Sequence, residues 1–222
     1  MDQTIQINQQ TIMQKVLAKF SYALLLMVVG MVIGALFIPP ALASLAPILC
    51  LGMLIVAFIA RWAKRGENGA MLPISMGFVY AFAALEGVGL YPLLLAYTQT
   101  IGAQLVLAAV GVTFVLFFGL ATYAQYTTRD FLQFGSVLFF ALIGLILLSI
   151  VGFFIQATML QIIIAAGGIF IFSGYVLYDI QLMRAGYISE ADIPWMVLSL
   201  FLDFINLLIH VLRLFGIFGS RD

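Results

Sequence analysis

Charge is scarce in this sequence. Of its 222 residues only 8% are Asp, Glu, Lys or Arg and 65% are hydrophobic, whereas a soluble domain carries about 25% charged residues. This composition excludes a water-soluble fold. Because a helix needs roughly 20 apolar residues to cross a bilayer, the chain has room for about six to eight crossings and for no separate soluble domain. We therefore expect a single integral membrane domain over residues 1–222.

The sequence also has a single cysteine and a net charge of zero. Cys50 is the one cysteine, so an internal disulfide or a cysteine-rich metal site is excluded. Nine basic residues balance nine acidic ones, which leaves no basic surface for nucleic acid. The sequence contains no nucleotide-binding loop, haem-attachment motif or zinc-type cluster. We expect no enzyme activity, no nucleic acid partner and no tightly bound cofactor.

Apolar runs between polar or proline-containing breaks give seven segments. They lie at about 20–38, 42–60, 72–96, 102–124, 132–154, 160–182 and 194–218. The first nineteen residues form a polar arm. The last segment is the least apolar, so a six-span protein with a re-entrant tail is the competing topology. The preferred interpretation is an all-α membrane protein with seven transmembrane helices.

The distribution of basic residues predicts the orientation. With the N-terminus inside, the three outer loops contain no Lys or Arg, and most basic residues fall on the cytoplasmic side. These are Lys15, Lys19, Arg61, Lys64, Arg65, Arg129 and Arg184. Such a bias indicates a cytoplasmic N-terminus and, with seven spans, an external C-terminus. Small residues at close spacing, such as Gly30 and Gly34, would let neighbouring helices approach closely.

Polar side chains recur along the last segment at spacings of four, three, four and three residues. They are Ser199, Asp203, Asn206, His210 and Arg213. At 3.6 residues per turn, these spacings place all five on one narrow face of a helix. Because a charged side chain near the bilayer centre costs about 2.5–3.5 kcal/mol, that face must meet other helices or water instead of lipid. The last helix is therefore predicted to lie in the middle of the bundle.

Two aspartates are predicted to face each other. Asp179 lies near the cytoplasmic end of the sixth segment, and Asp203 lies several residues into the seventh, which starts on the same side. At about 1.5 Å per residue the two carboxyls have similar depth in antiparallel helices. Two close carboxyls in a low-dielectric site do not readily both ionise, so they are expected to share a proton and to act as a pH switch. The alternative is that each aspartate only caps a helix or pairs with a basic neighbour.

Three further residues have open roles. Arg61, at the inner end of the second segment, either extends to the membrane interface or pairs with Asp179. Glu86, in the middle of the third segment, lies at a depth that Arg213 reaches, which favours an ion pair between them. His210 is more often a hydrogen-bonded packing residue than a metal ligand, because no cluster of ligands surrounds it.

Two motifs resemble a known family. Ser173–Asp179, Ile193-Pro194 and Leu198–Leu207 are similar to the Bax inhibitor-1 family, also called transmembrane Bax inhibitor motif proteins, in its bacterial branch. The resemblance implies seven helices, with two three-helix layers around a central C-terminal helix. It also implies a pH-sensitive calcium leak channel in the bacterial cytoplasmic (inner) membrane.

The resemblance also implies roles for individual residues. The aspartate pair that senses protons and weakly binds calcium maps to Asp179 and Asp203, and the basic residue that pairs with it in some members maps to Arg61. Bacterial relatives of the leak type can carry an acidic residue in the second span as partner of the last-helix arginine. Here Cys50 occupies that place, and Glu86 is the expected substitute.

Two other functions compete with the calcium leak. Some bacterial relatives resemble modulators of a membrane-bound protease, and the polar arm Met1 to Gln14 would then contact that partner. An intramembrane aspartyl protease would need a Gly-x-Gly-Asp sequence around its second aspartate, but Asp203 follows Leu200-Phe201-Leu202. The leak remains the leading prediction because an interaction protein does not need two buried carboxyls. Membrane lipid, calcium ions and protons are the expected partners.

Overall fold

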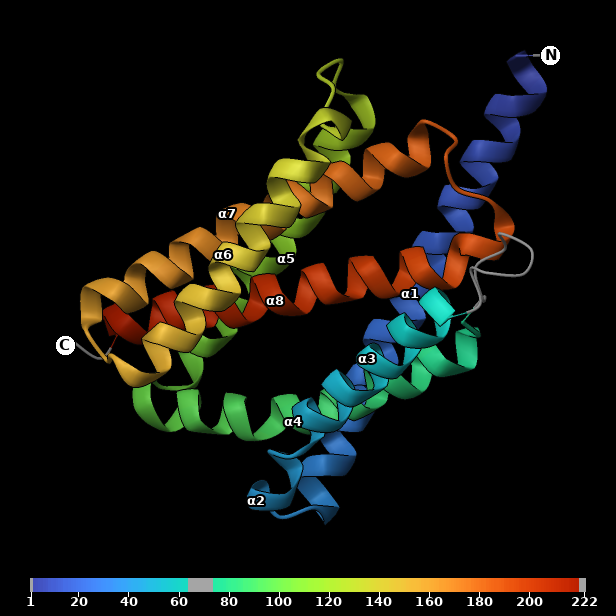
Figure 1. Cartoon of the computed structure of the whole chain (residues 1–222). Helices are drawn as coiled ribbons and strands as arrows, with labels where there is room; N and C mark the ends of the chain where they lie inside the picture. Colours follow the sequence, from blue (N-terminus) through green and yellow to red (C-terminus); the bar gives the residue numbers. More distant parts are fainter. Residues whose placement is uncertain (1, 64–73, 220–222) are drawn as a thin grey trace. The chain divides into compact units, whose positions relative to one another are not determined.

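The computed structural model describes the backbone of residues 2–63 and 74–219 and the side chains of residues 11–59 and 74–219 (Figure 1). The helices are α1 (Asp2–Phe37), α2 (Pro40–Ala43), α3 (Ala46–Ala63), α4 (Met76–Ile101), α5 (Ala103–Tyr126), α6 (Gly135–Phe154), α7 (Thr158–Arg184) and α8 (Ile193–Gly219). Two 3-10 turns, η2 (Leu132–Phe134) and η3 (Glu190–Asp192), precede α6 and α8. The described ranges contain no strand.

Within these ranges, seven helical segments are long and apolar enough to cross a membrane, which confirms the predicted all-α class and helix number. The last of them includes α8, which runs unbroken over 27 residues despite its polar side chains. A helix of that length is about 40 Å long at 1.5 Å per residue, enough to cross the hydrocarbon core. The continuous helix therefore favours seven spans over the re-entrant alternative.

The N-terminal polar segment is helical. The sequence predicts a polar arm over residues 1–19, and in the structure α1 starts at Asp2 and continues to Phe37. Ile12, Met13 and Val16 are buried. Their spacing puts them on one helix face, so this part of α1 has an apolar side to pack and the helix continues through it.

The chain divides into two compact units that share α8. Unit 1 consists of Met1–Ala96 and Ile188–Phe201, and unit 2 consists of Tyr97–Tyr187 and Leu202–Asp222. Each unit therefore contains three long helices, α1, α3 and most of α4 in unit 1 and α5, α6 and α7 in unit 2. In α8, 72% of the most apolar stretch is buried, compared with 17–33% in the other six spans.

In unit 1, α1 and α4 touch through their backbones. A Cβ atom at Gly30 would lie 2.0 Å from the carbonyl oxygen of Ala84, and one at Gly87 would lie 1.9 Å from that of Met27. Only glycine fits at such an approach, which is how small residues let membrane helices pack closely. A Cβ at Gly34 would lie 3.3 Å from Cα of Val88, so the predicted close packing at Gly30 and Gly34 is present.

An ion pair adds a connection within unit 1. Lys15 Nζ in α1 pairs with Glu190 Oε1 at the start of η3. Both side chains are well exposed, so solvent screens the pair and its contribution to stability is small. It nevertheless links the N-terminal part of α1 to the turn that leads into α8.

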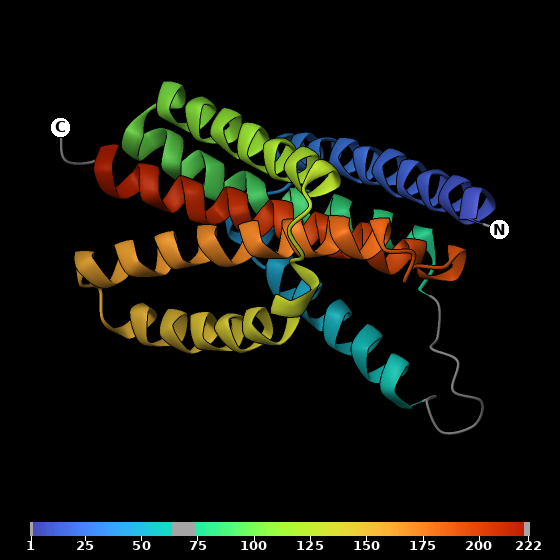
Figure 2. The same ribbon diagram turned by 90° about the horizontal axis from the view of Figure 1, so that it is seen from above.

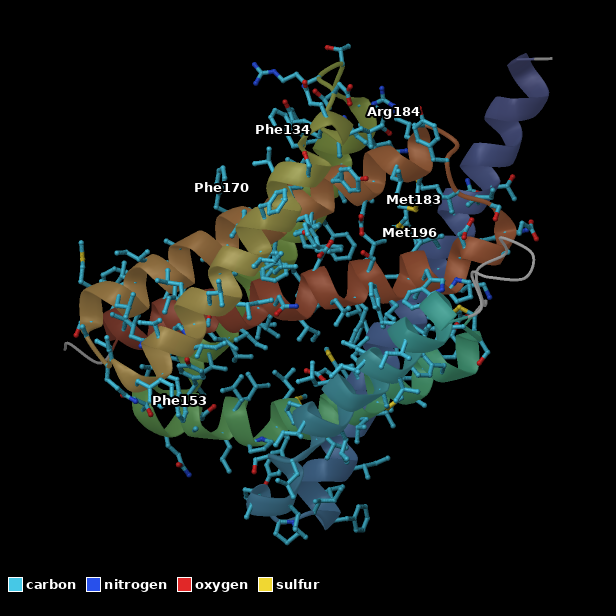
Figure 3. All side chains as sticks on the ribbon, viewed as in Figure 1. Phe134, Phe153, Phe170, Met183, Arg184 and Met196 are labelled. Carbon is cyan, nitrogen blue, oxygen red and sulfur yellow. The ribbon has the colours of Figure 1, made fainter. Side chains whose placement is uncertain are left out.

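In unit 2, α7 packs against both α5 and α6. The helices α6 and α7 form a hairpin and lie side by side in both ribbon views (Figure 1 and Figure 2). Phe204 of α8 contacts the rings of Phe114 and Phe117 of α5, with ring centres 5.0 Å and 5.4 Å apart. Phe170 on α7 is 80% exposed and points away from the neighbouring helices (Figure 3). Apolar side chains on such outer faces suit contact with lipid.

Candidate functional site

The two predicted aspartates lie together in the interior of unit 2. Asp179 is in α7 and Asp203 is in α8, and each is 4% exposed. Asp203 interacts electrostatically with Asp179, and both carboxyls interact with the hydroxyl of Tyr175, one helical turn before Asp179. The two helices run antiparallel, as expected from their short connection. The site is thus a carboxyl pair with a neighbouring phenol.

Apolar residues close to the pair along both helices are buried as well. Val176 and Ile180 on α7 and Phe204 on α8 are each at most 2% exposed. Oδ2 of Asp203 is buried and has no hydrogen-bond partner among the described residues. Burial of an ionised carboxylate without compensation costs several kcal/mol. Chemically, the pair can take up and release protons and offer oxygen ligands to a cation.

Gln181 fixes the end of α7 against the connection between α5 and α6. Its side chain is 5% exposed. Nε2 donates to the carbonyl oxygen of Arg129 at 2.7 Å, and Oε1 accepts from the backbone N–H of Phe131 at 2.6 Å. The side-chain amide thus gives a backbone carbonyl and a backbone N–H of the loop their hydrogen-bond partners, and it holds the loop in place. Asp179 lies two residues earlier in the same helix.

Arg184 continues this anchoring at the last residue of α7. Its Nη1 donates to the carbonyl oxygens of Ala124, Gln125 and Thr127 at 3.3, 3.0 and 2.8 Å, at the C-terminal end of α5. A guanidinium there satisfies carbonyls that the helix leaves without partners and complements the helix dipole. Arg184 and Phe134 lie at the same end of unit 2 (Figure 3).

These anchoring residues were missed at the sequence level. Arg184 entered the prediction only through its charge, as part of the cytoplasmic bias. Gln181 was not singled out, although it is a polar residue two positions after an intramembrane aspartate. That position could have indicated an anchoring role, because a buried amide in an apolar helix requires hydrogen-bond partners.

The remaining polar residues of α8 have different environments. Ser199 is half-buried and belongs to the unit 1 part of the helix. Asn206 is half-buried, and its Nδ2 donates to the carbonyl oxygen of Leu202 at 2.7 Å. Arg213 is half-buried and interacts electrostatically with the hydroxyl of Tyr97 in unit 2.

His210 is buried, with 7% of its surface exposed. Its ring stacks on Phe172 of α7, with centres 5.8 Å apart and planes inclined by 25°. A Cβ at Gly168 of α7 would lie 2.4 Å from three atoms of the ring. Nδ1 is buried without a hydrogen-bond partner among the described residues. The ring therefore packs closely against α7, and the role of His210 stays a prediction.

Glu86 and Cys50 are neighbours in unit 1. Glu86 of α4 is half-buried and lies within hydrogen-bonding reach of the Cys50 thiol of α3. Cys50 Sγ also lies 4.0 Å from the carbonyl oxygen of Phe82. The predicted ion pair between Glu86 and Arg213 joins the two units and stays a prediction. The side chain of Arg61 lies outside the described side chains, so its pairing with Asp179 also stays a prediction.

The donor set suits weak binding of a hard cation. Among the described residues, no group of three or more His, Cys, Asp or Glu side chains is placed to hold a metal ion. Calcium takes six to eight oxygen ligands, of which Asp179 and Asp203 supply only part. Water would complete the shell, and a partly hydrated ion is released easily.

Comparisons of the sequence with known proteins agree with one another on its family. The family model described as "Inhibitor of apoptosis-promoting Bax1" matches residues 9–220. A protein of Helicobacter pylori strain J99 is 34% identical over 169 residues, which cover 76% of this chain and 70% of the relative. An uncharacterized membrane protein of Streptococcus pyogenes serotype M3 is 35% identical over 169 residues, covering 73% and 70%. The chain belongs to the Bax inhibitor-1 family and is a multi-pass integral membrane protein with bacterial relatives.

Proposed function

We propose that this protein is a pH-sensitive calcium leak channel of the bacterial cytoplasmic membrane, with its N-terminus inside. The aspartate pair carries the proposal. Asp179 and Asp203 are buried, lie on adjacent antiparallel helices and interact with each other. Intramembrane carboxyls of this kind are costly and mark ion or proton pathways.

Protonation of the pair controls ion passage. With one shared proton, the carboxyls hold each other by a hydrogen bond. When that proton leaves, both carboxyls are negative, and the two like charges repel each other strongly in an interior of low dielectric constant. The repulsion is relieved by separation of the carboxyls, by a basic partner such as Arg61, or by a calcium ion with its water. Weak, partly hydrated coordination lets the ion leave again, as conduction requires.

The anchoring of α7 supports this role. Gln181 and Arg184 hold the helix end that carries Asp179 against α5 and the α5–α6 connection. The carboxyl therefore has a defined position relative to α5 and α6. A change of charge at the pair then acts on its position relative to Asp203 without disordering the end of α7.

Reconstitution tests the proposal directly. The full chain in liposomes that contain a calcium-sensitive dye is expected to pass calcium faster than protein-free liposomes. The rate is expected to differ by about tenfold between pH 6 and pH 8, which is roughly the ratio of the ionised fractions at these two pH values for a group that titrates midway between them. A calcium flux equal to that of protein-free liposomes at every pH would rule out the leak. A flux independent of pH would rule out proton control.

A further inference from the structure

The contacts between α7 and α8 in unit 2 follow one register. On α8, His210 lies seven residues after Asp203. On α7, Phe172, whose ring stacks on His210, lies seven residues before Asp179, which interacts with Asp203. Because the helices run antiparallel and seven residues are close to two full turns, the two pairs lie on one straight seam, about 10 Å apart along the helices.

The ring of His210 fills a notch in α7. A Cβ at Gly168 would lie 2.4 Å from three ring atoms, and the ring also stacks on Phe172, with centres 5.8 Å apart and planes inclined by 25°. The imidazole thus contacts two successive turns of α7. A slide of one turn in either direction would place Ile164 or Phe172 where Gly168 now makes room. The notch therefore accepts the ring in one register.

The contacts of this imidazole are those of a flat ring. Nδ1 of His210 is buried and has no hydrogen-bond partner among the described residues. Arg213, three residues later on α8, interacts with the ring electrostatically. The stack on Phe172 and the fit at Gly168 involve the ring as a whole. An aromatic ring without nitrogen atoms can make the same two contacts.

Within the described part of unit 2, few other ionisable groups accompany the carboxyl pair. Tyr175 on α7 interacts with both carboxyls and with the hydroxyl of Tyr178. On α8, Arg213 lies ten residues after Asp203. The titratable side chains of α5 are Tyr123 and Tyr126, near its C-terminal end, and α6 has none. The separation of the two carboxyls is therefore the main influence on how they share a proton.

We infer that His210 is a positioning residue for the carboxyl pair. Its ring, seated in the notch at Gly168, fixes the register of α7 against α8, and that register keeps Asp179 opposite Asp203. The inference deepens the proposed function and rests on it only where proton release by the pair is measured. The register itself exists whether or not calcium passes.

Crosslinking tests the register without reference to protons or calcium. In the full chain with Cys50→Ser, the changes Asp179→Cys and Asp203→Cys place two thiols at the facing positions. Dibromobimane, which becomes fluorescent when it links two nearby thiols, is expected to label this chain strongly. Adding His210→Ala is expected to lower the fluorescence by about threefold or more, because a seam free to slide by one turn separates the thiols by about 5 Å.

His210→Phe is the matched variant for the crosslinking test. It is expected to keep the fluorescence near the value measured with histidine, because a flat ring still fills the notch. No link with histidine in place would overturn the inference. Equal fluorescence with histidine, alanine and phenylalanine would do so too, and so would a loss with phenylalanine as large as that with alanine.

The pH at which the pair releases its proton is a second readout, which a residue that only fills space would not move. With both aspartates present, His210→Ala and Gly168→Ala are expected to move the midpoint of the infrared band of the protonated carboxyl to lower pH by about half a unit or more, because separated carboxyls share a proton less well. Gly167→Ala is the control, since its Cβ meets only Leu145 Cδ1 at 4.0 Å. It is expected to keep the wild-type midpoint.

The two proposals fail in different ways in this titration. A midpoint that is unchanged or higher in both His210→Ala and Gly168→Ala would contradict the positioning role. A wild-type chain without the infrared band would contradict proton control by the pair, and the crosslinking result would then decide the role of His210 by itself.

Discussion

Calcium flux through the Asp203→Asn variant is expected to be nearly the same at pH 6 and pH 8. Asparagine neither takes up nor releases a proton, and the remaining carboxyl of Asp179 loses the neighbour with which it interacts. The wild-type flux is expected to change by about tenfold over this range, and the variant flux by less than about twofold. Dye-loaded liposomes with matched protein content give both values.

The control for this prediction is Asp130→Asn. Asp130 is exposed in the α5–α6 connection of unit 2, where Oδ1 accepts from the backbone N–H of Leu132 at 2.8 Å. The amide oxygen of asparagine can still accept that hydrogen bond, so this variant removes one carboxyl without disturbing the loop. It is expected to keep the wild-type pH dependence. If Asp203→Asn kept it too, the aspartate pair would not be the sensor.

Replacement of Gly87 with alanine is expected to destabilise unit 1 strongly. The new Cβ would lie 1.9 Å from the carbonyl oxygen of Met27, a backbone atom that a rotamer change does not move. α1 and α4 must therefore separate, and overpacking of this kind costs about 1–3 kcal/mol or more. For a chain of this size, each kcal/mol lowers the unfolding midpoint by about 2–4 °C. Thermal unfolding in detergent, followed by helix content, measures the shift.

Gly52→Ala provides the comparison. Gly52 also lies in a unit 1 helix, α3, but a Cβ there has no other atom within 4 Å. Both variants add the same methyl group and make the same change in helix propensity. Gly52→Ala is expected to leave the midpoint within about 2 °C of the wild type. Equal midpoints for the two variants would show that α1 and α4 are not in backbone contact at Gly87.

The helices and the burial of the aspartates could be predicted from sequence for local reasons. Hydropathy over about 20 residues determines whether a segment can cross a membrane, and each polar residue that interrupts it is visible in the sequence. The spacing of Asp203, Asn206, His210 and Arg213 fixes one face of a helix whatever surrounds it. The burial of Asp179 and Asp203 could be predicted because a charged side chain within an apolar helix is costly to expose to lipid.

The hydrogen bonds that anchor the end of α7 could not be predicted from local sequence patterns. The hydrogen bonds of Gln181 join residues 50 and 52 positions apart, and those of Arg184 join residues up to 60 apart. No local pattern specifies which loop a side chain will reach. The continuity of α1 through the polar arm is likewise not evident from sequence. Its few apolar residues lie among polar ones and become informative only when their shared face is buried.

His210 illustrates the limit for a single residue type. The sequence placed it correctly on the polar face of the last helix, but a histidine on such a face is compatible with packing, hydrogen bonding or metal binding. The contact with Gly168 and the unused Nδ1 depend on how α7 lies against α8. These features of its environment could therefore not be predicted from the sequence.

The central claim is that Asp179 and Asp203 hold one exchangeable proton that leaves as the pH rises from 6 to 8. Infrared difference spectroscopy between these two pH values measures it, because a protonated carboxylic acid has a carbonyl stretch separate from that of a carboxylate. The account predicts that this band is present in the wild type at pH 6, is lost at pH 8, and is absent from the difference spectra of Asp179→Asn and Asp203→Asn. A wild-type difference spectrum without the band, or the same band in both variants, would contradict it.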